Sequence, residues 1–597
     1  MFFMTAKKFT KKFIAILCIC SLTLPISSCN KTASTTEKTN FSEAEKKEQQ
    51  EDFDNFLDQL FIEDVQSDSI TLNYTLSKPQ DYGITNFTPT FGEYSIDHMK
   101  EELITVENTY KKLTEFPYNA LTQDQQLIYD ILADYYKITG TEEKYLLYGE
   151  VLGSTTGIQA QLPILLAEYN FYTKEDITHY LDLLLCVPEY FSKIGEFERA
   201  KSKAGLFMSK DTANNIIDQC KAFVKNPKKN YLIDIFNDRI DAYEGLTKKE
   251  KTEFKKKNKN AILNSVIPAY EDLITLLEEL KSTGRVHEGT CSMPDGKEYY
   301  EILAKSISGS NKSIKEMKKA LSETAYQASL KMNNLYQNDN GIFEDFVNMK
   351  FPMTNPEEII PYLTKKVEED FPALEPVNCT VKYVHESLED HLSPAFYLTP
   401  AIDNYENNSV YINGNDEYDL SQIYPTVAHE SYPGHLLQSV YFNQQNPHPI
   451  RSMLNYGGYS EGWATYCEMY SYEISGLDRN VAEYAKQYSI FTLCLYAEID
   501  IGVNYDGWDL EELKDYLSDY GITDESVAKS AYDLVIDDPA NYLQYVIGYI
   551  EFAQLRKKAE DTLGDNFNAK EFHTFLLHIG PAPFYIIDSY MEKWMEE

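Results

Sequence analysis

Residues 429–435, with the sequence HESYPGH, constrain this chain more than any other segment. In the pattern H-E-x-x-H two histidines hold a zinc ion from one face of a helix, but here six positions separate His429 from His435. Residues six apart on a straight helix face about 240° apart, so they cannot share an ion. Pro433 cannot donate the helical hydrogen bond, and Gly434 can adopt dihedral angles closed to other residues. We therefore predict a bulge or break at this Pro-Gly pair that returns His435 to the face of His429.

A later carboxylate completes a recognisable ligand set. Glu461 opens the segment EGWATYCE, so His429, His435 and Glu461 supply the two imidazoles and one carboxylate of a catalytic zinc site whose fourth position holds water. We predict that these three side chains bind one zinc ion per chain. Glu430, beside the first histidine, is predicted to be the general base that takes a proton from the metal-bound water.

The segment that contains Glu461 is predicted to be a helix with Ser460 as its N-cap residue. Glu468 lies seven residues after Glu461 and therefore shares its helix face. A carboxylate there is predicted to accept the second N–H of a ligand histidine and so to orient the ring. Gln438 is a weaker candidate for the same supporting role.

Two other patterns compete for a function. Residues 385–391 (HESLEDH) have the same histidine spacing but no Pro-Gly pair, so they are predicted to be a surface segment. Residues 458–462 (GYSEG) match G-x-S-x-G, in which Ser460 would be the nucleophile of a serine hydrolase. That arrangement needs a strand before the serine and a helix after it, inside a parallel α/β sheet. The preceding RSMLNYG is a poor strand, which makes the serine hydrolase a less favoured alternative.

The N-terminus is predicted to be a lipoprotein signal peptide. A lysine-rich start precedes an apolar stretch at 13–25 that is too short to span a bilayer as a mature helix. Residues 26–29 (ISSC) form a lipobox, so residues 1–28 are predicted to be removed and Cys29 to carry lipid; an ordinary signal peptide with a chance cysteine is the alternative. Residues 29–50 are predicted to be a flexible tether. The predicted location is extracytoplasmic, anchored to the cell membrane at Cys29.

The pattern of the rest of the chain predicts a mainly α fold, because apolar residues recur at three- and four-residue spacing. CTVKYVH, AFYLTP and SVYIN are short, β-branched and aromatic, and they predict a small sheet just before the histidine motif. A loop near 289–297 predicts a boundary between an N-terminal helical lobe (51–290) and a C-terminal catalytic lobe (291–597). The net charge of −39 argues against a nucleic-acid partner, since it would repel phosphate.

The segment HESYPGHLLQ followed by EGWATYCE resembles the bacterial family catalogued as domain of unknown function 885, which pairs H-E-x-x-P-G-H-x-x-Q with E-G-W-A-x-Y-x-E. PDGKEYY, SGSNKS, YVIGYIEFAQLR and FLLHIGPAP resemble the family in order, so the resemblance covers most of the chain after the tether. The family in turn resembles gluzincin-type zinc peptidases, such as thimet-oligopeptidase-like enzymes. The resemblance implies peptidase activity and a multi-helical cleft fold with a small sheet beside the metal-binding helix.

By the same resemblance, Tyr545 and Arg556 of YVIGYIEFAQLR face the cleft, where the tyrosine stabilises an oxyanion and the arginine binds a peptide carboxylate. The alternative is a helix in which the tyrosine packs in the core and the arginine is solvated. Tyr411 and Asn413 of SVYIN are candidates for an edge strand that pairs with an extended substrate.

These patterns together predict a membrane-anchored, extracytoplasmic zinc metallopeptidase that hydrolyses oligopeptides with a metal-activated water and Glu430 as the base. The predicted partners are a peptide substrate and, through the lipid on Cys29, the membrane. The main alternative from another class is a non-catalytic peptide-binding lipoprotein with a vestigial metal site.

Overall fold

The computed structural model describes residues 41–139, 143–154, 156–286, 289–386, 389, 392–416 and 418–596. The predicted signal peptide, Cys29 and most of residues 385–391 lie outside these ranges. The chain divides into two compact units. The N-terminal unit contains the described residues before 287 and the short segment Ala401–Asn404, and the C-terminal unit contains Gly289–Pro400 and Tyr405–Glu597.

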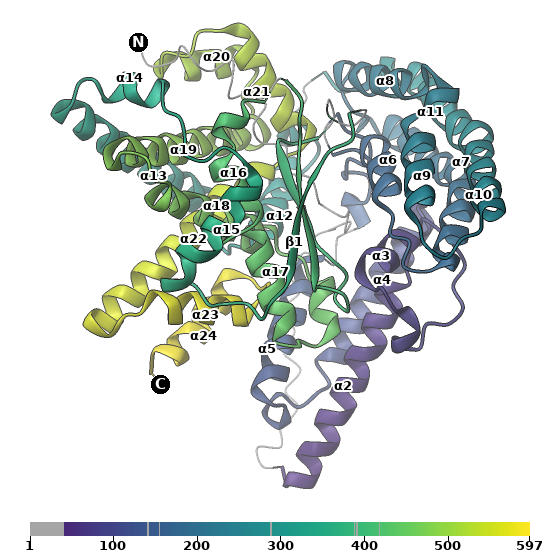
Figure 1. The fold of residues 1–597 in the computed structure, drawn as a ribbon, viewed down its shortest axis with the longest axis horizontal. Helices are drawn as coiled ribbons and strands as arrows, with labels where there is room; N and C mark the ends of the chain where they lie inside the picture. Colours follow the sequence, from purple (N-terminus) through teal and green to yellow (C-terminus); the bar gives the residue numbers. More distant parts are fainter. Residues whose placement is uncertain are drawn as a thin grey trace. The chain divides into compact units, whose positions relative to one another are not determined.

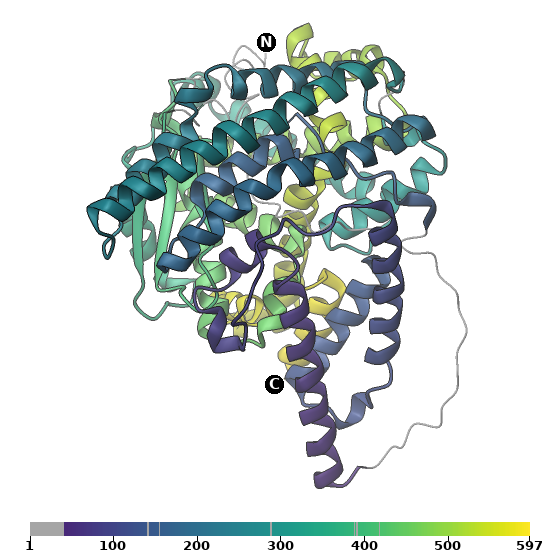
Figure 2. The same ribbon diagram turned by 90° about the vertical axis from the view of Figure 1, so that its right-hand side faces the viewer.

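The N-terminal unit is built from helices. The continuous run of α10, a π-helical turn at Ile262–Val266 and α11 packs along α7 (Figure 2). The longest of these helices is α7, and a capping box between Thr173 and Asp176 closes its N-terminus. The α-helices of this unit are α2 (Glu43–Val65), α3 (Ser69–Thr75), α4 (Ile96–Leu113), α5 (Gln123–Thr139), α6 (Ile158–Glu168), α7 (Lys174–Ala204), α8 (Lys210–Val224), α9 (Tyr231–Ala242), α10 (Lys248–Ala261) and α11 (Ile267–Leu280).

The start of α2 corrects the predicted extent of the tether. The helix begins at Glu43, so the last eight residues of the predicted tether, 43–50, are helical. Ser42 and Glu45 form a capping box, in which each side chain bonds the other residue's backbone N–H. This local signal outweighs the polar composition of the segment.

The C-terminal unit, drawn from teal to yellow in Figure 1, is also mainly helical. Its central helix is α18, which is buried along most of its length and contacts α12, α16, α17, α19 and α22. The α-helices of this unit are α12 (Gly296–Ser308), α13 (Ile314–Asn338), α14 (Ile342–Val347), α15 (Pro356–Lys366), α16 (Tyr424–Glu430), α17 (His435–Gln444), α18 (Gly457–Ser471), α19 (Arg479–Ile501), α20 (Leu510–Asp519), α21 (Glu525–Asp537), α22 (Asn541–Leu563), α23 (Ala569–Ile579) and α24 (Phe584–Glu596).

Close backbone contact sets the position of α18 against its neighbours. A Cβ atom at Gly462 would lie 2.5 Å from the Cα atom of Gly548 on α22, and one at Gly458 would lie 1.8 Å from the carbonyl oxygen of Ser308. Only glycine allows such an approach. The glycines of GYSEGWA therefore let α22 lie directly against the helix that carries Glu461.

The predicted small sheet is present and lies beside α16 (Figure 1). It has three strands in the order β1-β3-β2, with β1 (Asn378–Tyr383) parallel and β2 (Ala395–Leu398) antiparallel to β3 (Asn407–Ile412). A mainly α fold with a small sheet next to the histidine helix is thus confirmed. Within the described part of the chain, no helix is both long enough and apolar enough to cross a membrane.

Candidate metal centre

The predicted break between the two histidines is a complete interruption of the helix. Helix α16 ends at Glu430 and α17 begins at His435. Between them the Tyr432–Pro433 peptide bond is cis, and the Gly434 N–H donates to the carbonyl oxygen of Ala428 at 3.1 Å. A Cβ atom at Gly434 would lie 1.8 Å from the carbonyl oxygen of His429, so this turn requires glycine.

The turn is fastened to α18. The carbonyl oxygen of Pro433 accepts a hydrogen bond from the indole N–H of Trp463 at 3.0 Å and one from the Cys467 thiol at 3.3 Å. Gln438, one turn into α17, donates its side-chain amide to the carbonyl oxygen of Tyr459 at 3.2 Å. All five of these groups are buried, so the turn and α17 are held against α18 on both sides of Glu461.

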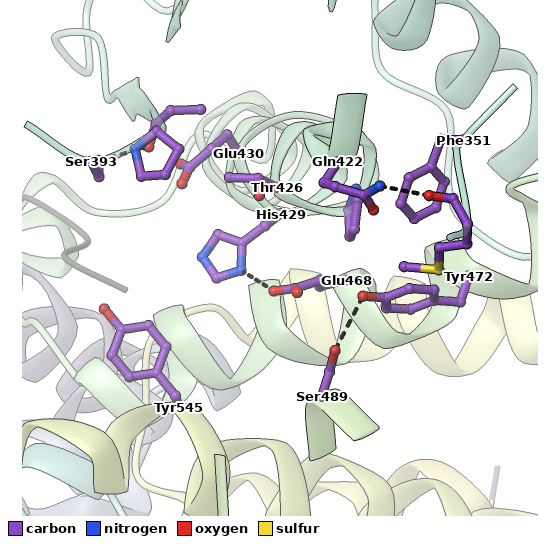
Figure 3. Close-up of a pocket in the computed structure, with 14 residues that line it drawn as sticks. Phe351, Ser393, Gln422, Thr426, His429, Glu430, Glu468, Tyr472, Ser489 and Tyr545 are labelled. Carbon is purple, nitrogen blue, oxygen red and sulfur yellow. Dashed lines mark hydrogen bonds and ion pairs between the residues drawn. The ribbon is translucent and has the colours of Figure 1, made fainter. Parts of the chain in front are cut away.

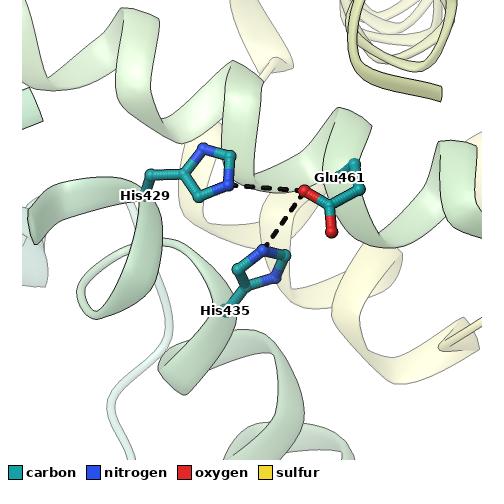
Figure 4. Close-up of side chains that lie close together, drawn as sticks. All are labelled: His429, His435 and Glu461. Atoms are coloured by element: carbon teal, nitrogen blue, oxygen red, sulfur yellow. Dashed lines mark ion pairs between the residues drawn. The ribbon is translucent and has the colours of Figure 1, made fainter. Parts of the chain in front are cut away.

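His429, His435 and Glu461 converge on one point, as Figure 4 shows. The Nε2 atoms of His429 and His435 lie 3.4 and 3.5 Å from the same carboxylate oxygen, Oε2 of Glu461. One potential ligand atom from each residue lies within 4.8 Å of the other two. This group of three could hold a metal ion, and it is the one such group of His, Cys, Asp and Glu found among the described residues.

The donor atoms fit a divalent cation. Oε2 of Glu461 is buried and makes no hydrogen bond of regular geometry, although two imidazoles lie beside it. Burial by itself would raise the pKa of Glu461, but the two histidines hold that pKa well below its ordinary value, so the group is an anion. Two imidazole nitrogens and one carboxylate oxygen are the donors that zinc prefers.

Glu468 lies on the other side of the His429 ring. Its Oε2 atom is 3.3 Å from Nδ1 of His429, while Nε2 of the same ring faces Glu461. Burial would lower the pKa of His429, but the carboxylates of Glu461 and Glu468 raise it well above its ordinary value. The ring is therefore held between two carboxylates, in an orientation that points Nε2 at the cluster.

Glu430 follows His429 directly and is buried. Its carboxylate accepts a hydrogen bond of 2.9 Å from the backbone N–H of Tyr397, in strand β2. Burial raises the pKa of Glu430, and the nearby His429 and His435 oppose this shift. A buried carboxyl group with a raised pKa next to a potential metal site has the properties of a general base.

Tyr545 shares a pocket with His429 and Glu430, and its hydroxyl points into that pocket (Figure 3). It projects from α22, which the glycine contacts described above bring against α18. The structure thus brings Tyr545 to the candidate site, together with Glu468. Gln438 does not line this pocket, and its side-chain amide donates to the backbone of α18.

Arg556 is not brought to this pocket. It lies 11 residues after Tyr545 on α22, which puts it on the same helix face but about 16 Å further along the axis. Its guanidinium group donates to Glu560 at 2.8 Å and to the Tyr466 hydroxyl at 2.7 Å. The described contacts of Arg556 are therefore structural.

The prediction that Tyr411 and Asn413 belong to an edge strand is wrong. Strand β3, which contains Tyr411, lies between β1 and β2, so both of its edges are already paired. The Tyr411 ring stacks on Phe396 at 4.7 Å, and the buried Asn413 amide donates to the carbonyl oxygen of Leu392 at 2.8 Å. The strand at the edge next to Glu430 is β2.

Ser460 does not form a nucleophile elbow. Helix α18 begins at Gly457 with Tyr456 as its N-cap, so Ser460 is inside the helix and is not the predicted cap. The element before α18 is a 3₁₀ helix at Pro449–Met453, where a serine hydrolase would need a strand. The glycines that suggest the elbow instead serve the packing of α18.

Two groups that support the site are not predicted from the sequence. The backbone N–H of Tyr397 has no side-chain signal, because any residue offers the same donor. Trp463 does have a signal, since it is the only tryptophan of EGWATYCE, but its partner is a backbone carbonyl that no motif identifies.

The fold and the site define a mainly α-helical protein with a His₂Glu group, in which His429 is buried and His435 and Glu461 are half-buried. A family model described as "Bacterial protein of unknown function (DUF885)" matches residues 81–591, and the chain belongs to this family. No curated protein matches the chain.

Two solved structures are similar to this one. The "putative lipoprotein from Colwellia psychrerythraea" is 19% identical, with a TM-score of 0.82 over 92% of this chain and 99% of that chain. A "putative lipoprotein of unknown function from Shewanella oneidensis" is 17% identical, with a TM-score of 0.62 over 93% of this chain and 100% of that chain. At these identities the likeness establishes the fold.

Proposed function

We propose that this protein is a zinc-dependent peptidase that hydrolyses peptide bonds of oligopeptides outside the cytoplasm. One observation carries the proposal: His429, His435 and Glu461 bring three zinc-type donor atoms within 4.8 Å of one another, and Glu430 lines the pocket that reaches this group. A histidine pair, one carboxylate ligand and a separate glutamate are the elements of metal-assisted hydrolysis.

The residues around the site have separate tasks. Zinc, when bound by His429, His435 and Glu461, would polarise the scissile carbonyl and make water more acidic. Glu430 takes the proton from the attacking water and later gives it to the leaving amine. Burial raises the pKa of Glu430, which makes its carboxylate a stronger base for the first of these transfers. The Tyr545 hydroxyl donates a hydrogen bond to the oxygen that becomes negatively charged.

Strand β2 supports a peptide as the substrate. Ala395 of β2 lines the same pocket as Glu430, and β2 is an edge of the sheet. An edge strand offers backbone groups that can pair with an extended chain, and on β2 these are groups other than the Tyr397 N–H, which donates to Glu430. A peptide beside β2 would therefore carry its bonds past the carboxylate of Glu430.

Hydrolysis of a mixed oligopeptide library, followed by mass spectrometry, tests the function. The purified protein is expected to cleave peptides, to lose this activity with a zinc chelator and to regain it when zinc is added back. Cleavage that survives complete removal of metal would contradict the zinc mechanism. A protein that holds zinc and cleaves no peptide would instead support the peptide-binding alternative.

The proposed location rests on the lipobox at residues 26–29 and on the description "putative lipoprotein" that the two solved structures named above carry. Cleavage before Cys29 and attachment of lipid to its thiol would anchor the protein on the outer side of a membrane. Mass spectrometry of the mature N-terminus is expected to find a lipid-modified Cys29. A mature N-terminus at another residue would contradict the anchor.

A further inference from the structure

A pocket extends away from the candidate metal centre, between α16, α18, α19 and the chain near Phe351 (Figure 3). His429, Glu430 and Tyr545 line one end of it, and Phe351 and Tyr472 line the other. None of the roles proposed above for the catalytic groups uses this second end. A substrate bound at the metal centre would have to place some part of itself there or leave it to water.

The far end has an aromatic wall with little freedom to move. The Phe351 ring stacks on Tyr424 with 5.2 Å between ring centroids, and it lies 6.1 Å from the ring of Tyr472. The Tyr472 hydroxyl is hydrogen-bonded to the Ser489 hydroxyl at 3.1 Å. Gln422 donates its amide to the carbonyl oxygen of Met349 at 2.8 Å, which fixes the segment that carries Phe351. Such a preformed apolar wall favours an apolar group.

The charges around the pocket disfavour a charged group. Among the described residues that line it, none is Lys or Arg, and His429 lies at the end next to the metal centre, so an acidic side chain at the far end would find no cationic partner there. Its two carboxylates already have partners, since Glu430 accepts from the Tyr397 N–H and Glu468 lies against His429. A basic side chain would have to compete with these contacts and would lose its hydration.

We propose that this pocket binds an apolar or aromatic side chain of the substrate residue next to the scissile bond. The proposal rests on the peptidase function and names its substrate class: peptides with residues such as Leu or Phe at the cleavage site. Phe351 and Tyr472 provide the contact surface, and Ser489 limits the depth because it sits beside the Tyr472 hydroxyl.

The test uses unblocked alanine pentapeptides in which one position at a time is Ala, Leu, Phe, Glu or Lys. Mass spectrometry locates the cleaved bond, and kcat/KM is measured for each peptide with the full-length protein. At one position beside the cleaved bond, peptides with Leu or Phe are expected to have a kcat/KM at least about tenfold higher than peptides with Ala, Glu or Lys. Filling an apolar pocket gives selectivity of this size in other enzymes. Equal rates for all five, or the highest rate for Glu or Lys, would overturn the proposal.

Two variants with the same substitution locate the effect. Ser489→Leu places a larger side chain at the wall of the pocket, and the ratio of kcat/KM for the Phe peptide to that for the Ala peptide is expected to fall about tenfold or more. Ser518→Leu, on the exposed side of α20, should leave this ratio unchanged. An unchanged ratio in a zinc-containing Ser489→Leu protein would overturn the assignment of this pocket.

A binding measurement separates this proposal from the peptidase function. Calorimetry with Glu430→Gln, which lacks the proposed base, gives the Kd of the same pentapeptides without turnover. Suppose that Glu430→Gln binds the Leu and Phe peptides more tightly than the others, but that the parent protein cleaves none of them. This result would support the pocket and contradict the peptidase function. Cleavage by the parent with no preference in rate or Kd would contradict the pocket and leave the peptidase function standing.

Discussion

Gly434 approaches His429 so closely that a Cβ atom on the glycine would lie 1.8 Å from the histidine's carbonyl oxygen. The contact arises in the turn between α16 and α17, where the Gly434 N–H donates to the carbonyl oxygen of Ala428, and this turn brings both imidazoles to Glu461. The distance between two histidines six positions apart thus depends on a turn that has no room for a side chain.

Gly434→Ala is therefore expected to lower zinc affinity. Overpacking at such a contact costs about 1–3 kcal/mol. If all of this strain acts on the metal site, zinc affinity falls by roughly 5- to 150-fold. Pro433→Ala combined with Gly434→Ala should lower it further, because alanine favours a continuous helix that turns His435 away. Zinc titration followed by spectroscopy measures the affinity. Gly149→Ala is the matched control, since its Cβ would meet no atom within 4 Å. If the double variant bound zinc as tightly as the parent, His435 would not be a ligand.

Glu468→Gln is expected to weaken zinc binding by about 10- to 100-fold, the usual effect of removing the partner of a ligand histidine. The amide keeps the shape of the carboxylate but loses the charge that lies 3.3 Å from Nδ1 of His429. Competition with a chromophoric chelator measures the change. Glu473→Gln, an exposed position shortly after α18, should have no effect. Equal zinc affinity in the Glu468 and Glu473 variants would show that Glu468 does not orient His429.

Tyr545→Phe is expected to reduce kcat by about 10²- to 10³-fold while zinc content stays at the parent level, because the lost hydroxyl acts on the charge that develops during reaction. Tyr549→Phe removes a hydroxyl one turn later on the same helix and should leave kcat near the parent value. Steady-state kinetics on a peptide identified from the library provide the comparison. A normal kcat in the Tyr545→Phe enzyme would show that Tyr545 has no catalytic role and serves only in packing.

The N-terminal unit should lose stability as the pH rises towards neutrality. Glu198 in α7 is fully buried, and both of its carboxylate oxygens lack a hydrogen-bond partner among the described residues. Burial raises the pKa of Glu198 to about 7, although Lys201 opposes the shift. The protonated side chain therefore stabilises the folded state fully below about pH 4.5, and this contribution is lost as the pH rises through about 7.

Glu198→Gln should remove this pH dependence, since the amide is neutral at every pH. The free energy of unfolding of the variant is expected to exceed that of the parent by on the order of 1–3 kcal/mol at pH 8, and to differ little from it at pH 5. Thermal unfolding at both pH values gives the comparison. If the difference in unfolding temperature between variant and parent were the same at the two pH values, Glu198 would not titrate in this range.

Much of the candidate site could be predicted because its signals are local. The Pro-Gly pair predicts a helix break between His429 and His435, and the spacing of Glu461 and Glu468 puts both on one face of α18. The helix start at Glu43 could have been found as well, since Ser42 and Glu45 match a capping box.

The errors concern contacts between distant segments. Strand order depends on how β1, β2 and β3 pair, and nothing in the three segments shows that β3 lies in the middle. The family resemblance implies that Tyr545 and Arg556 both face the cleft, but it does not show that Tyr466 and Glu560 bind the guanidinium group of Arg556. Only the packed structure decides which part of a long helix face meets the site.

Glu430→Gln tests the central claim most directly, with zinc content and peptide hydrolysis measured on the same preparation. The amide keeps the shape of the side chain but cannot take a proton from water. We predict about one zinc per chain, as in the parent, and hydrolysis reduced by at least about 10²-fold. Glu344→Gln, at an exposed position of α14, should match the parent in both measurements. Near-normal hydrolysis by Glu430→Gln would contradict the proposed peptidase mechanism.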